Sequence, residues 1–118
     1  DFGYDSGAAA ARALLEQNPR PTAIIASSDQ MALAALDTAL ERGLRVPEDL
    51  SLVSFDNTPV ARFTVPQLTA IDQPIAATFA KAVELLITQG DALDQPQPVV
   101  TESCLVQRGS TAPPGGNA

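Results

Sequence analysis

The sequence predicts an α/β fold, a three-layer sandwich in which a mainly parallel sheet lies between layers of helices. Short apolar runs alternate along the chain with longer segments whose apolar residues recur every three or four positions. Such alternation is typical of parallel strands joined by right-handed crossovers. With 118 residues, of which 45% are hydrophobic, the chain is long enough to bury a core.

The first half of the chain contains a helix, a strand and a second helix. A helix is expected over residues 5–18, because Asp5 and Ser6 can cap it and the following proline disfavours its continuation. Residues 22–27 (TAIIAS) are typical of a strand that is buried on both faces. Asp29 is expected to cap the next helix, over residues 30–42, which ends at Gly43. One stripe of this helix is predicted to face the sheet: Ala32, Ala35, Leu36, Ala39 and Leu40.

The second half is predicted to contain three strands and one helix. Strands are expected over residues 50–55 and 68–72, each after a turn or loop that contains proline. A helix over 75–89 closes at Gly90, with Ala82, Leu85, Leu86 and Gln89 on its buried side. The last strand is expected over 99–107, and a Pro/Gly-rich tail follows from residue 110.

Composition narrows the possible functions. The net charge is −7 and the seven Lys and Arg residues are scattered singly, so this chain lacks the basic face that binding a nucleic-acid backbone requires. With one cysteine, Cys104, and no histidine, neither an internal disulfide nor a zinc site is expected, which favours a cytoplasmic protein. No apolar run approaches the ~20 residues that span a bilayer, so no membrane partner is expected.

Catalysis is not predicted, because the chain has no glycine-rich phosphate loop, no serine elbow and no histidine base. Asp29 and Asp56 both follow strands and could form a carboxylate pair like that of a sugar hydrolase. Asp29 is better explained as a helix cap, whereas Asp56 fits a turn residue or a ligand contact equally well. Neither a catalytic residue, a cofactor nor a metal is therefore expected.

Four motifs, in order and at matching intervals, carry a family resemblance. They are residues 21–32 (PTAIIASSDQMA), 43–57 (GLRVPEDLSLVSFDN), 66–74 (PQLTAIDQP) and 105–111 (LVQRGST). They resemble the effector domain of the lactose/galactose repressor (LacI/GalR) family of transcription regulators, which has a type I periplasmic-binding-protein-like fold of two lobes. The resemblance covers the chain from Phe2 to Thr111.

The resemblance implies a division of the chain. Residues 1–73 would belong to the C-terminal lobe, and residues 74–98 to the N-terminal lobe. Residues 99–112 would return as a strand to the C-terminal lobe, and residues 113–118 would form a tail. Contact with DNA would come only through an N-terminal helix-turn-helix that this chain does not contain. Without its lobe, the helix over 75–89 is expected to pack back on its own domain or to swap into a second chain.

The same resemblance implies site residues. Asp56 corresponds to an aspartate that hydrogen-bonds sugar hydroxyls or polar base groups, and Phe2 to a phenylalanine that stacks on the ligand, although a core aromatic is an equal alternative. Ser28 stands where sugar-sensing members often have Asn, and Gln73 lines the cleft or satisfies hinge backbone. A homodimer interface is implied on one helix, through Leu33, Leu36 and Leu40, although Leu36 and Leu40 fit the chain's own core better.

These observations predict the effector-sensing part of a DNA-binding transcriptional regulator, a repressor whose small-molecule effector is a sugar or a similar polar metabolite. The alternative is a periplasmic-type sugar-binding protein that serves a transport system. A carboxylate-dependent hydrolase is the third hypothesis, and the missing base disfavours it.

Overall fold

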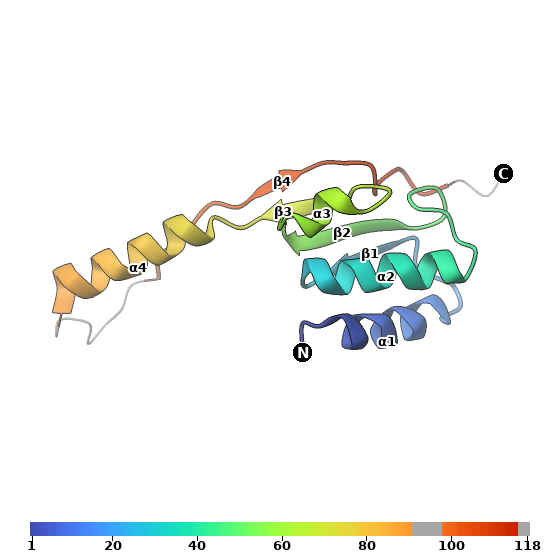
Figure 1. Ribbon diagram of the computed structural model, residues 1–118, viewed down its shortest axis with the longest axis horizontal. Helices are drawn as coiled ribbons and strands as arrows, with labels where there is room; N and C mark the ends of the chain where they lie inside the picture. Colours follow the sequence, from blue (N-terminus) through green and yellow to red (C-terminus); the bar gives the residue numbers. More distant parts are fainter. Residues whose placement is uncertain (91–97, 116–118) are drawn as a thin grey trace.

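The computed structural model describes residues 1–90 and 98–115. The helices and strands alternate as expected (Figure 1), and one unexpected helical turn lies in the loop after the second strand. The elements are α1 (Tyr4–Leu15), β1 (Ala23–Ala26), α2 (Asp29–Glu41), β2 (Ser51–Asp56), α3 (Val60–Phe63), β3 (Thr69–Asp72), α4 (Ile75–Gln89) and β4 (Cys104–Val106).

The four strands form one sheet in the order β1-β2-β3-β4. β1 pairs with β2 and β2 with β3 in parallel, which confirms the mainly parallel sheet. β4 is antiparallel to β3, with Ala70 opposite Val106. The strand expected over 99–107 is shorter than predicted, because only the three residues opposite 70–72 find partners at this edge.

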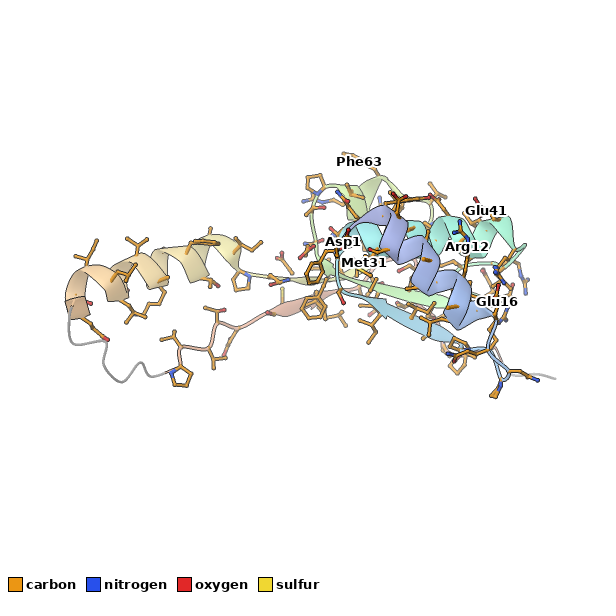
Figure 2. All side chains as sticks on the ribbon, turned by 90° about the horizontal axis from the view of Figure 1, so that it is seen from below. Asp1, Arg12, Glu16, Met31, Glu41 and Phe63 are labelled. Atoms are coloured by element: carbon orange, nitrogen blue, oxygen red, sulfur yellow. The ribbon has the colours of Figure 1, made fainter. Side chains whose placement is uncertain are left out.

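The core lies on one face of the sheet. Ile24 is 9% exposed and Leu52 is fully buried, whereas Ile25, which points to the other face, is 70% exposed. The prediction that residues 22–27 are buried on both faces was therefore wrong. Figure 2 shows α1, α2 and α3 on the same side of the sheet. Of the three layers expected, the described residues supply the sheet and one layer of helices.

Two helix starts differ from expectation. α1 begins at Tyr4 after Gly3, because the Asp1 carboxylate accepts hydrogen bonds from Gly3 N at 2.9 Å and Ser6 Oγ at 2.6 Å. The prediction that Asp5 and Ser6 cap this helix was wrong. Ser28, not Asp29, caps α2, since its Oγ accepts from the backbone N–H of the third residue on at 3.2 Å.

The predicted core stripe of α2 is confirmed except at its end. Leu40 is 49% exposed, while its four partners are at most 2% exposed. The helix ends one turn after Leu36, and Gly43 takes the left-handed conformation expected there, with φ +73°.

α1 and α2 approach so closely that only glycine fits at one position. A Cβ at Gly7 would lie 2.7 Å from Cα of Met31, which Figure 2 shows beside the first turns of α1. We expect Gly7→Ala to destabilise the chain by about 1–3 kcal/mol because the two backbones must separate. An exposed helical Gly→Ala change stabilises by up to about 1 kcal/mol. Urea denaturation shows whether the free energy of unfolding falls or rises in the variant. A more stable variant would contradict the close contact between α1 and α2.

α4 extends away from the sheet as an arm (Figure 1), and the chain measures 60 × 25 × 24 Å. None of its residues is buried, so the side predicted to be buried, Ala82, Leu85, Leu86 and Gln89, is not. Of the two alternatives expected for this helix, packing back on its own domain was therefore wrong, and a swap into a second chain stays a prediction. Of the predicted segment 74–98 and tail 113–118, residues 91–97 and 116–118 lie outside the described residues.

One exposed ion pair gives a pH-dependent contribution to stability. Arg45 Nε and Nη2 donate to the two carboxylate oxygens of Asp49 at 2.8 and 2.9 Å, and these bonds hold the pKa of Asp49 well below its usual range. A depressed pKa stabilises the fold above the unfolded value, about 3.9, and the gain is lost as the pH falls through the folded value. Asp49→Asn should therefore flatten the fall in stability from pH 5 to pH 2. Urea midpoints across this range test it, and unchanged slopes would refute it.

Candidate functional site

An open cavity of about 480 Å³ lies where β1 and β2 reach their carboxyl ends. Parallel α/β sheets bind ligands in this place, because loops from several strands meet there. The cavity is lined by three of the predicted site residues, Phe2, Ser28 and Asp56. The fold therefore brings together side chains from three separate segments of the sequence.

Asp56 is the last residue of β2. One of its carboxylate oxygens, Oδ1, accepts a hydrogen bond from Gln73 Nε2 at 3.0 Å. The carboxylate still has free lone-pair positions, and it is an acceptor-only group that suits hydroxyl and N–H donors on a ligand. Gln73 does not line this cavity. It lines a neighbouring one of about 230 Å³ at the base of α4, so the structure connects it to the site through Asp56.

Phe2 and Ser28 also line this cavity. Phe2 is 69% exposed, which rules out the alternative that it is a core aromatic. Ser28 is buried, and its Oγ donates to the backbone carbonyl of Phe2 at 2.8 Å while it caps α2. The hydroxyl thus ties the backbone of Phe2 to the start of α2, a contact that the sequence did not indicate.

Asp29, which the sequence offered only as a helix cap or as a carboxylate partner of Asp56, lines the same cavity as Asp56. Neither its contact with Thr58 nor the contact of Arg108 with Asn57 was indicated by the sequence. Asp29 is 2% exposed, and its Oδ2 accepts from Thr58 N at 2.6 Å and from Thr58 Oγ1 at 2.7 Å. Arg108 Nη2 donates to Oδ1 of Asn57. Both contacts join segments far apart in the sequence, so no local pattern could have found them.

The three leucines predicted at a dimer interface occupy different environments. Leu36 is 2% exposed and belongs to the chain's own core, which leaves it no surface for a partner. Leu33 is partly exposed and Leu40 is 49% exposed. These two leucines remain available for contact with a second subunit.

Other site types have less support within residues 1–90 and 98–115. There, no three His, Cys, Asp or Glu side chains gather in a way that could hold a metal ion. No helix of this part of the chain is long and apolar enough to cross a membrane. Cys104 is exposed at the sheet edge with a free thiol.

Comparison with known proteins agrees with this arrangement. Residues 3–111 match the family model of the periplasmic binding protein-like domain. Catabolite control protein A of Priestia megaterium is 45% identical over 86 residues, which are 73% of this chain and 26% of that protein. The HTH-type transcriptional repressor PurR of Escherichia coli O1:K1 / APEC is 39% identical over 113 residues, which are 95% of this chain and 33% of that protein.

Solved structures show the same relationship. A LacI family transcriptional regulator from Bifidobacterium animalis subsp. lactis superposes with a TM-score of 0.87 at 38% identity, covering 97% of this chain and 42% of that one. A complex of the transcriptional regulator CelR with cellobiose superposes with a TM-score of 0.82 at 39% identity, covering 93% of this chain and 34% of that one.

The open α/β sheet, with a cavity at the carboxyl ends of its parallel strands, defines a domain of the periplasmic-binding-protein type. The chain belongs to the family of periplasmic binding protein-like domains, and the relatives and solved structures named above to which it is similar are transcription regulators, among them a LacI family member. It spans about a quarter to a third of the length of these two curated relatives.

Proposed function

We propose that this chain is part of the effector-binding domain of a transcriptional repressor, and that it forms one wall of the cleft for a small polar effector. The observation that carries the proposal is the cavity at the carboxyl ends of β1 and β2, where Phe2 and the Asp56 carboxylate line the same space. Two chemically different contacts, one aromatic and one acidic, suit a ligand with both a flat apolar face and polar edges.

The effector is a sugar or a similar polar metabolite. The Asp56 carboxylate would accept hydrogen bonds from two adjacent hydroxyls or from ring N–H groups, and the exposed Phe2 ring would stack on the flat face. A site built to hydrogen-bond such donors rejects analogues that lack them, because its polar groups are then left unpaired. The cellobiose bound to the similar regulator CelR supports the sugar class.

Regulation requires parts of the protein outside this chain. Residues 1–73 and 99–112 would form the C-terminal lobe, and residues 74–98 would belong to the opposite lobe. Effector binding between the lobes would shift the population of two global states and so change the affinity for DNA. DNA would be bound by a separate N-terminal domain, in the cytoplasm, by a homodimer that uses Leu33 and Leu40 of α2.

The alternative of a periplasmic sugar-binding protein for transport has less support. The relatives PurR and catabolite control protein A are a repressor and a control protein, and the two solved structures are transcriptional regulators. The chain upstream of this sequence distinguishes the two functions, since a helix-turn-helix there would exclude transport and a signal peptide would exclude repression.

A thermal-shift screen of the full-length protein against mono- and disaccharides and nucleobases tests the proposal. A compound that binds only the native state at a hundred times its Kd stabilises it by about 2.7 kcal/mol. We expect at least one compound with several hydroxyl or N–H donors to stabilise the wild type in this way. If none stabilises it, the effector-binding function is wrong. If nucleobases stabilise it and sugars do not, only the sugar class is wrong.

A further inference from the structure

Asp56, the last residue of β2, and the next two residues each form a hydrogen bond with a different segment of the chain. Gln73, after β3, donates to Asp56, and Arg108, after β4, donates to Asn57. The carboxylate of Asp29, at the start of α2, accepts from both donors of Thr58. Each of the residues 56, 57 and 58 thus has its own contact from a different segment.

This turn needs such support because its backbone is strained. Asp56 has φ +131° and Asn57 has φ +59°, so two consecutive non-glycine residues have a positive φ. Residues with a side chain rarely adopt positive φ. Asparagine tolerates the left-handed region better than most residues, whereas the φ of Asp56 lies outside that region and persists only where the surroundings hold the residue there. The direction of the Asp56 side chain depends on this turn, since its Cβ follows from the backbone angles.

The Arg108 side chain contacts Asn57, the second residue of this turn with a positive φ. Its guanidinium group is partly buried and donates two hydrogen bonds, from Nη1 to Leu68 O and from Nη2 to Asn57 Oδ1. The planar group presents both donors in a rigid geometry that lysine cannot reproduce. Leu68 directly precedes β3, so Arg108 ties the turn after β2 to the neighbouring strand of the sheet.

We propose that Arg108 is a positioning residue for the effector site: by holding Asn57 in its left-handed conformation, it aims the Asp56 carboxylate into the cavity. Arg108 itself does not line that cavity. The link to an effector rests on the proposed function, whereas the hold on the turn does not. The competing explanation is that Arg108 only fastens the returning chain to the sheet, through Leu68 and through its own N–H, which donates to Thr69 Oγ1 at 2.9 Å.

Hydrogen exchange of the full-length protein, read by mass spectrometry, separates the two explanations. In Arg108→Met, we expect exchange in the peptide covering residues 56–60 to rise about tenfold, because a hydrogen bond from a charged donor is lost. Peptides from β1 and α2 should not change. Arg108→Lys should restore part of the protection. Arg62→Met, the same substitution at an exposed residue of α3, is the matched control and should leave the turn unchanged.

A double-mutant cycle shows whether Arg108 acts through Asn57. Asn57→Gly removes the acceptor and keeps positive φ accessible, so Arg108→Met should have little further effect on residues 56–60 in that background. Additive effects, or faster exchange confined to residues 66–70 and 104–112, would overturn the proposal. The readout needs no effector, so a failed ligand screen would leave it standing, and unchanged exchange at the turn would refute it without touching the proposed function.

Discussion

Asp56→Asn is expected to weaken effector binding by roughly tenfold to a hundredfold, because a hydrogen bond to a charged acceptor contributes about 1.5–3 kcal/mol. Asparagine has nearly the same shape, and its amide oxygen can still accept the hydrogen bond from Gln73 Nε2. The turn should therefore persist while the site loses its charge and half of its acceptors. Isothermal titration of the full-length protein with the compound that stabilises it most in the thermal-shift screen measures the change in Kd.

The matched control is Asp5→Asn. Asp5 is exposed in the first turn of α1 and does not line the cavity, so the same loss of charge should change Kd by less than about twofold. Equal affinities for the wild type and the Asp56 variant would mean that the carboxylate is only a turn residue.

Leu52→Ala is expected to destabilise the chain by about 2–5 kcal/mol, the usual range for a fully buried leucine. Leu52 has no exposed surface and lies beside Ile24 in the sheet, on the face that the helices cover. The loss is a large fraction of the stability of a small domain, about 5–15 kcal/mol. Urea denaturation followed by circular dichroism measures it.

Leu105→Ala provides the comparison, because it makes the same change on the opposite face. Leu105 lies beside Ile71 on β4 and is 63% exposed, so its truncation should cost less than about 1 kcal/mol in this chain. Equal losses at Leu52 and Leu105 would contradict a core that lies on one side of the sheet.

Local patterns predicted the elements well, and long-range features poorly. The bounds of α4 follow from a run that Pro74 and Gly90 enclose, and α2 ends as Gly43 indicates. Exposure of Ile25 and of α4 could not be predicted, because it depends on which other segments cover them, and two adjacent isoleucines look alike whether one face or both are covered. β4 was too long in the prediction because only its pairing with β3 defines its length.

The candidate site was likewise predictable only in part: its residues could be selected from the sequence, but their contacts could not. Asp56 could be selected because polar residues after strands lie at the ligand-binding edge of a parallel sheet, and Phe2 and Ser28 by family resemblance. The contacts that hold them were not predictable. The Asp29 side chain turns to Thr58 rather than to its own helix, and Arg108 reaches Asn57 across 51 positions of sequence.

A crystal structure of the full-length protein with the compound that stabilises it most tests directly whether the cavity lined by Asp56 and Phe2 is the effector site. We expect ligand density in the cavity at the carboxyl ends of β1 and β2, within hydrogen-bond distance of the Asp56 carboxylate and against the Phe2 ring. Density at another place, with this cavity filled only by water, would mean that Asp56 and Phe2 do not form the effector site.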